Sequence, residues 1–261
     1  MTSVRAVEKD FLFRYNGEMK AIERTNGQGA SVGAFCRLSL RGWLFLVLPT
    51  GILSAVFCRY WIDLPVARWC WMRHYEAFGI KYPKFVHKIL TLMEVFGDYL
   101  GIVLVALLIF ELDRHHRGRL LRFLTAILFS GLTVNVIKFF VIRRRPQGFR
   151  FFDPDLVAQH DVLLIDWTPW MSAVKSIENS FPSGHTATAF TTFVVLSFFY
   201  PEGRRLFFAL AILVGVQRIM VCAHFPSDVI VGAMIGSFIG GAFTSLGRLP
   251  KVFDCWETYD K

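Results

Sequence analysis

The sequence predicts an all-α fold, a polytopic helical bundle that crosses a membrane about six times. Hydrophobic residues make up 54% of the 261 positions, and 27 residues are Phe. The mean hydropathy of +0.45 is higher than that of ordinary soluble domains. Six apolar stretches approach the roughly 20 residues that a helix needs to cross the hydrocarbon core. We therefore expect an integral membrane protein that has the lipid bilayer as a partner.

The predicted spans follow one another through short connections. They lie near residues 42–58, 89–110, 120–142, 185–200, 206–222 and 227–247. Tyr200-Pro201-Glu202-Gly203 separates the fourth and fifth spans and is typical of a tight turn between antiparallel helices. One membrane domain, residues 41–250, accounts for all six spans. Residues 1–40 are then a cytosolic or interfacial extension without the apolar core of a secretory signal, and residues 251–261 are a short tail.

Charge and cysteine content argue against other classes of protein. The net charge of +9 comes from basic residues spread over short connections, and no nucleic-acid recognition motif is visible, so we expect no nucleic-acid partner. The five cysteines are scattered, without the spacing of metal ligands or of a disulfide framework. The sequence therefore predicts neither a metal site nor a cofactor, and it leaves the oligomeric state open.

A first, basic motif lies at the C-terminal end of the third predicted span. Lys138 is followed seven positions later by Arg145-Pro146, a spacing that places both cations near one face of a helix. The pair suits phosphate binding, because a guanidinium offers two parallel donors and an ammonium offers a point charge. The alternative is a basic flank, in which Arg143, Arg144 and Arg145 only mark the end of a span.

A second motif, Pro182-Ser183-Gly184-His185, precedes the fourth span. The N–H groups at the start of that helix would face a bound anion, while Ser183 adds a hydroxyl and Gly184 permits close approach of the backbone. The imidazole of His185, on the first helical turn, is suited to protonate a leaving alkoxide near neutral pH. The alternative is an ordinary helix N-cap with an interfacial histidine.

A third motif, QRIMVCAHFPSD, joins the fifth and sixth spans. Its candidate nucleophile is His224, because Asp228, four positions on, can hold one ring nitrogen and leave the other free to attack phosphorus. Arg218 would neutralise the equatorial oxygens of the transition state. A plain salt bridge between Arg218 and Asp228 is the alternative, and it leaves His224 unexplained.

All three motifs fall on one side of the membrane if the six spans alternate in direction. Once the site cations are set aside, that face carries fewer Lys and Arg residues than the opposite face. The positive-inside rule then places the opposite face in the cytoplasm. We therefore expect a protein of the inner cell membrane whose site faces the periplasm or another extracytoplasmic compartment.

The three motifs together resemble the pattern K-x6-RP, PSGH and SR-x5-H-x3-D of the type 2 phosphatidic acid phosphatase superfamily. The resemblance covers about residues 85–247. It implies a six-helix membrane fold and metal-free transfer through a phosphohistidine on His224, with Asp228 orienting that ring and His185 as the general acid. By matching position, the phosphate cradle would comprise Lys138, Arg145, Ser183, Gly184 and Arg218.

Two positions depart from the family pattern. Gln217 stands where the family usually has Ser before the arginine of the third motif, and Cys222 stands where Gly is common. Gln217 keeps a donor and an acceptor, but its longer side chain can alter the geometry of the phosphate cradle. Neither position carries proton transfer or nucleophilic attack, so the predicted reaction class does not change.

Two further features lie near the motifs. The connection 147–181 mixes aromatic and Asp residues, which is typical of an interfacial lid over a site or of an aromatic anchor without gating. Glu94 and Asp98 form an i, i+4 carboxylate pair at the motif-facing start of the second span. They either meet the site cations, or they are solvated at the helix end or form an ion pair with Lys88 or Arg143.

These residues predict an enzyme that removes phosphate from a lipid monophosphate or diphosphate. The sequence leaves open whether that lipid is an isoprenoid, a glycerophospholipid, a sphingoid or lipid A. One alternative is a phosphotransferase that passes the phosphoryl group to another lipid. A second is a catalytically silent lipid-binding membrane protein, which has no chemical reason to combine two histidines with an aspartate. Haloperoxidases have a related fold but resemble soluble proteins, and the six predicted spans argue against them.

Overall fold

The computed structural model describes residues 42, 47–74, 84–112, 117–148, 164–165, 179–246, 249–250 and 252–253. All of them belong to one compact unit, Leu38–Lys261. The predicted N-terminal extension, most of the predicted tail and most of the connection 147–181 lie outside the described residues. The domain bounds and the interfacial lid therefore stay predictions.

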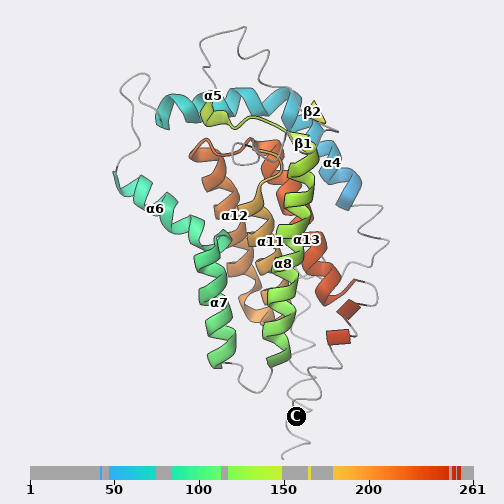
Figure 1. Cartoon of the computed structure of the whole chain (residues 1–261). Coiled ribbons are helices and arrows are strands. Elements are labelled where there is room, and N and C mark those ends of the chain that lie inside the picture. The colour runs from blue at the N-terminus through green and yellow to red at the C-terminus, as the bar shows by residue number, and fades with distance from the viewer. Residues whose placement is uncertain are drawn as a thin grey trace, which may run out of the picture. The chain divides into compact units, whose positions relative to one another are not determined.

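The described part of the chain is almost entirely helical (Figure 1). It begins with α4 (Leu48–Phe57), the π-helical turn η3 (Cys58–Ile62), α5 (Asp63–His74), α6 (Lys84–Glu94), the 3₁₀ turn η4 (Val95–Gly97) and α7 (Tyr99–Leu112). Next come α8 (Arg117–Phe140), β1 (Val141–Ile142), the 3₁₀ turn η5 (Pro146–Gly148) and β2 (Leu164–Ile165). The last elements are α11 (Gly184–Phe199), the 3₁₀ turn η7 (Pro201–Gly203), α12 (Arg204–Met220) and α13 (Pro226–Thr244). Helices thus form in each predicted apolar stretch, and η7 is the expected turn between α11 and α12.

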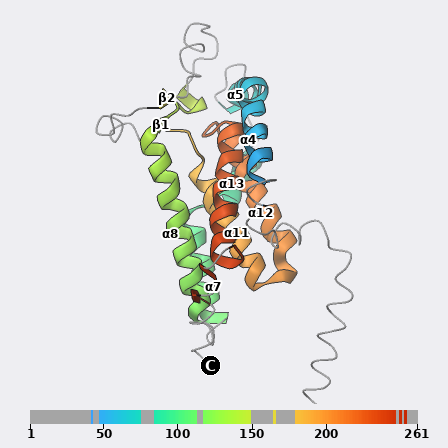
Figure 2. The same cartoon turned by 90° about the vertical axis from the view of Figure 1, so that its right-hand side faces the viewer.

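Helix α11 packs against α8, α12 and α13 (Figure 1, Figure 2). Its contact with α13 is very close, because Gly232, Gly236 and Gly240 repeat every four residues along one face of α13. A Cβ at Gly232 would lie 2.5 Å from the carbonyl oxygen of Ser183, and one at Gly236 would collide with the carbonyl oxygen of Ala187. Small residues at this spacing let two helix backbones approach within a membrane. The glycines therefore hold the N-terminus of α11 against that of α13.

Length and apolar composition identify two membrane-spanning helices among the described residues, Gly118–Phe140 and Pro226–Thr244. The pair Lys88–Gly97 and Tyr99–Glu111 meets the same criterion only when taken together, and it is bent by 59°. Helix α11 is apolar, but its 16 residues are fewer than the roughly 20 that cross a bilayer unaided. The protein is an integral membrane helical bundle, and the total of six spans stays a prediction.

The second predicted span is not the continuous helix that we expected. Helix α6 ends at η4, and the extended Asp98 (φ −104°, ψ 165°) occupies the N-cap position of α7, where its backbone carbonyl oxygen accepts a hydrogen bond from Ile102 N at 3.1 Å. Gly97 is packed so tightly against α11 that a Cβ there would lie 2.6 Å from the carbonyl oxygen of His185. The break therefore follows from a capping residue and from contact with a distant helix, which an apolar pattern does not reveal.

The third predicted span ends earlier than we expected. Helix α8 stops at Phe140, so the prediction that Lys138 and Arg145 share one helical face was wrong. The chain continues in an extended conformation, in which β1 pairs antiparallel with β2 and Arg144 forms a bridge with Asn179. The β-branched residues of β1 and the proline after Arg145 both disfavour helix.

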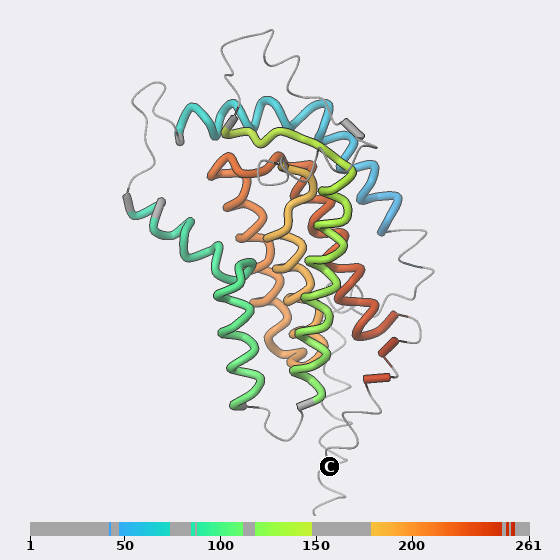
Figure 3. The backbone as a smooth tube through the Cα atoms, in the orientation of Figure 1, coloured from blue at the N-terminus to red at the C-terminus, as the bar shows by residue number. Residues whose placement is uncertain are grey.

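The first predicted span continues beyond its expected end. Helix α4 runs through η3 into α5, and Figure 3 shows this path as one continuous tube in blue. In the views of Figure 1 and Figure 2, α5 lies across the end of the bundle at which α8 ends and α13 begins. The sequence interpretation missed α5, because its charged residues do not fit a membrane span.

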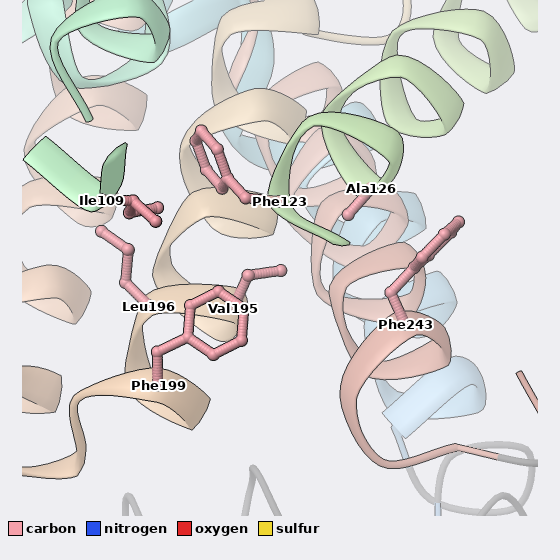
Figure 4. Close-up of a cluster of buried hydrophobic side chains, with 7 residues drawn as sticks. All are labelled: Ile109, Phe123, Ala126, Val195, Leu196, Phe199 and Phe243. Carbon is pink, nitrogen blue, oxygen red and sulfur yellow. The ribbon is translucent and has the colours of Figure 1, made fainter. Parts of the chain in front are cut away.

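The opposite end of the bundle is filled by apolar side chains. Figure 4 shows this cluster, which comprises Ile109, Phe123, Ala126, Val195, Leu196, Phe199 and Phe243. They come from α7, α8, α11 and α13, so one cluster ties four helices together far from the motif residues. Aromatic packing adds to it, with the rings of Phe129 and Phe243 centred 5.5 Å apart.

Candidate active site

The three motifs meet at the end of the bundle where α8 and α12 finish and α11 and α13 begin. Lys138 is near the end of α8, His185 is the second residue of α11, and Arg218 lies in the last turn of α12. His224 occupies the short turn before α13, and Asp228 lies in the first turn of that helix. The fold thus brings together residues that are up to 90 positions apart in the sequence.

His224 is buried, with only 3% of its surface exposed. Its Nδ1 lies 2.7 Å from the carbonyl oxygen of Ser180, whereas Oδ2 of Asp228 is 3.9 Å away. The direct hydrogen bond to Asp228 that we expected is therefore not the closest contact of the ring. Because a carbonyl oxygen only accepts, Nδ1 carries the proton and Nε2 keeps its lone pair.

The surroundings of His224 keep its imidazole neutral. Burial lowers the pKa of His224 well below its ordinary value of 6.5, and the charges of Arg145 and Lys138 lower it further. The hydrogen bond with Ser180 acts in the opposite direction and does not overcome these effects. A neutral ring with a free Nε2 is the form in which histidine acts as a nucleophile.

Asp228 is wholly buried and acts on His224 through an intermediary. Its Oδ1 lies 2.5 Å from Nη1 of Arg143. Its Oδ2 accepts hydrogen bonds from the Ser180 hydroxyl at 2.5 Å and from the Phe225 N–H at 2.9 Å, the second of which caps α13. The carboxylate therefore holds Ser180, whose carbonyl group holds the histidine ring.

The turn that carries His224 folds back on the end of α12. The N–H groups of Ala223 and His224 both donate to the carbonyl oxygen of Arg218, at 3.1 and 3.2 Å. Cys222 has a φ of 57°, a left-handed conformation that favours glycine and that accounts for the residue common in the family at this position. Burial raises the pKa of the Cys222 thiol to about 12, so this cysteine is not a reactive thiolate.

Glu94 and Asp98 lie beside the candidate general acid. Nε2 of His185 is 3.4 Å from Oε1 of Glu94 and 3.8 Å from Oδ1 of Asp98. The second oxygen of Glu94 lies 2.6 Å from Nη2 of Arg218. Of the two alternatives that the sequence left open, the structure thus favours contact with the site cations, and Arg143 pairs elsewhere. The break between α6 and α7 brings both carboxylates to this position.

Gln217 holds the arginine that follows it. Its Oε1 accepts a hydrogen bond from Nε of Arg218 at 2.6 Å, and its Nε2 donates to Oε2 of Glu94 at 3.1 Å. The longer side chain therefore bridges Arg218 and Glu94, a distance that the usual serine hydroxyl is too short to cover. The departure from the family pattern orients the guanidinium rather than disrupting it.

Ser183 and Gly184 shape the start of α11. Ser183 is wholly buried, its hydroxyl lies 2.9 Å from that of Thr186, and it accepts a longer hydrogen bond of 3.5 Å from the Thr186 N–H. This hydroxyl caps the helix, which is the alternative that the sequence offered. A Cβ at Gly184 would make only an ordinary contact, 3.6 Å from Val134, so packing alone does not require glycine there.

Three cations surround the two histidines. Lys138, Arg145 and Arg218 all lie within electrostatic reach of His224, and Lys138 and Arg218 also reach His185. Within the described ranges, no group of three or more His, Cys, Asp or Glu residues is placed to hold a metal ion. The arrangement presents fixed positive charge around a neutral imidazole, which suits a phosphoryl group.

Several residues of the site escaped the sequence interpretation. Asn179 accepts a hydrogen bond from Arg143 N at 3.0 Å and donates to the carbonyl oxygen of Lys138 at 2.9 Å, so it joins the first motif to the second. Ser180 and Asp63 were also overlooked. Their signals were weak: Asn179 and Ser180 stand three and two positions before Pro182 of the second motif, and Asp63 is an acid that closely follows an apolar stretch.

Residues 119–249 match the PAP2 superfamily, the type 2 phosphatidic acid phosphatases. The chain belongs to this superfamily. The match covers half of the chain and confirms the resemblance that the three motifs carry. The PAP2 region includes the candidate residues of all three motifs, whereas Asp63, Glu94 and Asp98 lie outside it.

Curated relatives of this PAP2 protein include proteins named as lipid phosphatases. A lipid A 1-phosphatase of Rhizobium etli is 39% identical over 114 residues, 44% of this chain and 44% of that protein. Lipid phosphate phosphatase 2 of Arabidopsis thaliana is 31% identical over 159 residues, 54% of each chain. The chain thus spans about half the length of the curated relatives it matches. A crystal structure of Aquifex aeolicus LpxE aligns with a TM-score of 0.49 and 23% identity, over 70% of this chain and 94% of that one.

Proposed function

We propose that this chain hydrolyses a lipid monophosphate or diphosphate in the membrane and that His224 is its nucleophile. The observation that carries the proposal is the state of that ring: buried, neutral, bound at Nδ1 by the Ser180 carbonyl and surrounded by fixed cations. The names of the PAP2 relatives support the same reaction class.

In the first step, Nε2 of His224 attacks phosphorus and the bond from phosphorus to the lipid oxygen breaks. Lys138, Arg145 and Arg218 neutralise the charge that the equatorial oxygens carry in the transition state. His185, with a third of its side chain exposed, takes up a proton when the negatively charged phosphate group binds beside it, and it donates that proton to the departing oxygen. The products of this step are the free lipid and a phosphohistidine.

In the second step, water attacks the phosphohistidine and gives a proton to the now neutral His185. The bond between phosphorus and Nε2 breaks, inorganic phosphate leaves, and both histidines return to their starting states. The guanidinium groups and the ammonium supply the positive charge that a metal ion supplies in other phosphatases. We therefore expect turnover in the presence of a chelator.

The substrate class follows from the membrane setting. The site lies at the end of apolar helices, so a phosphate borne by a lipid is presented to it at the level of the headgroups. Relatives with 39% and 37% identity are both named lipid A 1-phosphatase, which makes lipid A the first candidate to test. We place the site on the extracytoplasmic face of the inner membrane, on the strength of the Lys and Arg distribution.

The test is release of inorganic phosphate by the full chain purified in detergent, with EDTA present. The panel comprises lipid A, undecaprenyl diphosphate, phosphatidate and phosphatidylglycerol phosphate, and His224→Gln is assayed alongside. We expect the wild type to release phosphate from at least one lipid. Loss of the nucleophile should lower the rate by at least roughly 10⁴-fold.

A quench experiment tests the intermediate. Protein-bound phosphate that survives alkali and is lost in acid should appear on the peptide that carries His224, and should be absent from His224→Gln. Activity that disappears with EDTA and returns with a divalent metal would sink the metal-free mechanism. Appearance of the label on an added acceptor lipid instead of in free phosphate would establish transfer and overturn hydrolysis.

A further inference from the structure

A buried carboxylate on α5 lies at the end of the bundle that carries the three motifs. Asp63 is the first residue of α5, and none of its side chain is exposed. Its Oδ2 lies 2.8 Å from Nη2 of Arg143, and its Oδ1 accepts a hydrogen bond from Ser227 N at 3.0 Å. The Ser227 hydroxyl also donates to Asp63. A residue far from the three motifs in sequence therefore holds the first turn of α13.

Arg143 links Asp63 to the turn that carries His224. Its guanidinium is 1% exposed, stacks on the Phe225 ring at 4.1 Å and donates from Nη1 to the Ser227 hydroxyl at 2.7 Å. The same Nη1 lies 2.5 Å from Oδ1 of Asp228. The backbone of Arg143 contributes separately, because its carbonyl oxygen accepts a hydrogen bond of 2.7 Å from Ser180 N. Arg143 thus fixes both Asp228 and the backbone of Ser180.

This series of contacts ends at His224, the proposed nucleophile. Asp228 holds the Ser180 hydroxyl at 2.5 Å, and the Ser180 carbonyl holds Nδ1 of His224 at 2.7 Å. Every side chain from Asp63 to His224 along this path is at least 97% buried. Buried ion pairs are costly to form and weak as a source of stability, so a path of this kind needs another explanation.

We infer that Asp63 is a positioning residue for His224 and that it acts through Arg143. The path orients the ring and fixes its Nδ1–H tautomer. Two carboxylates against one guanidinium leave a net negative charge, which stabilises the positive charge that the ring acquires as phosphorus bonds to Nε2. The inference rests on the proposed function for its kinetic consequences, whereas the tautomer of His224 is a property of the protein alone.

The first experiment replaces the carboxylate by its isosteric amide. Asp63→Asn should lower kcat about 10- to 100-fold, the usual effect of a residue that orients a catalytic ligand. KM and the vanadate inhibition constant should stay within about twofold, because the three cations of the cradle are untouched. Asp63→Glu, which restores the charge, should recover part of kcat. A change of KM without a change of kcat would overturn the inference.

A matched pair of arginines separates positioning from stability. Arg143→Lys and Arg122→Lys each alter a buried arginine, one just beyond the C-terminus of α8 and one near its N-terminus. Arg122 lies over the Phe198 and Phe253 rings at 5.3 and 5.5 Å. Both substitutions should lower the unfolding midpoint. Arg143→Lys alone should lower kcat of the folded enzyme by about 10-fold or more. Equal effects on kcat from the two substitutions would contradict a positioning role.

A double-mutant cycle and a spectrum complete the test. Ser180→Ala cuts the path at its hydroxyl, so Asp63→Asn should change kcat by no more than about twofold in that background. In ¹⁵N NMR spectra, His224 of the wild type should show one neutral tautomer, and Asp63→Asn should show a mixture. A wild type with the single tautomer and no phosphatase activity would count against the function and still support the path. An unchanged tautomer and unchanged kcat in Asp63→Asn would overturn it.

Discussion

The two ends of the bundle each bury an arginine, but they surround it differently. At the end that carries the three motifs, the proposed catalytic end, Arg143 lies between the carboxylates of Asp63 and Asp228. At the opposite end, Arg122 lies over aromatic rings beside the apolar cluster that includes Phe123. The guanidinium groups are both almost wholly buried, with 1% and 0% exposed. The side chains around them therefore determine what each arginine does.

The interactions around the two arginines differ in whether they have a preferred geometry. Hydrogen bonds and ion pairs have preferred angles and distances, so the network around Arg143 specifies where the His224 ring lies. Apolar contacts are nondirectional and hold the helices together without specifying any one side chain. A membrane protein that buries polar groups in one place and apolar groups in another thus separates positioning from cohesion. The following substitutions test whether that separation holds.

The largest expected effect is on stability at the apolar end. Phe123→Ala removes a ring that is wholly buried among four helices, and it should lower the free energy of unfolding by about 3 kcal/mol. Turnover per folded molecule should not change. Unfolding in increasing denaturant and phosphate release measure the two quantities. Leu128→Ala, on an exposed face of the same helix, is the control and should cost much less. A Phe123→Ala enzyme that is folded but inactive would break the separation.

The next effect is on pH dependence at the catalytic end. Burial is the main cause of the lowered pKa of His224, and the positive charge of Lys138 contributes to it. Removal of that charge makes protonation of the ring easier, so Lys138→Met should raise the pKa and move the acid limb of kcat/KM upward by about 1 pH unit. Ionisation of the substrate affects the pH profiles of the wild type and of the variant equally, so it does not contribute to the difference between them. Lys88→Met, on the exposed face of α6, removes the same charge and should leave the limb in place.

A smaller effect is expected at Glu94. Its carboxylate contacts Arg218, Gln217 and His185, the donors that phosphate oxygens would use. Glu94→Gln removes this competing charge, so vanadate should bind about fivefold more tightly, which corresponds to about 1 kcal/mol for a partly exposed ion pair. The inhibition constant measures it. Glu111→Gln, at the far end of the same bent helix pair, should leave the constant unchanged. Weaker vanadate binding in Glu94→Gln would show that the carboxylate supports the cradle.

The smallest effect concerns the turn that carries His224. Cys222 has a positive φ, which costs alanine energy in the folded state and costs glycine almost none. Glycine, however, loses more backbone entropy than alanine on folding. The Cys222→Gly variant should therefore be more stable than Cys222→Ala by roughly 0.5 kcal/mol, the difference between these two effects. At Cys70, in the regular helix α5, the order should reverse by about 1 kcal/mol. Unfolding midpoints of the four variants provide the measurement. The same order at both positions would show that the turn relaxes to another conformation.

Comparison of the predicted spans with the structure shows which helices can be predicted from local sequence patterns alone. The third, fourth, fifth and sixth spans correspond closely to α8, α11, α12 and α13. Apolar composition and length determine such helices, and the turn residues between α11 and α12 have a strong local preference. The first span continues into α5, whose first residue, Asp63, contacts Ser227 at the start of α13. The second span breaks at Gly97, which packs against His185 of α11.

The fold class, the family and the residue types of the candidate site could all be predicted from the sequence. Those depend on composition, on apolar periodicity and on residues such as Lys138, His185 and His224 whose spacing is visible along the chain. Only the tertiary structure decided which polar groups pair. In the structure Ser180, rather than Asp228, contacts Nδ1 of His224. A hydrogen bond is decided by distances of a few ångströms between distant segments, and no local pattern along the chain encodes those distances.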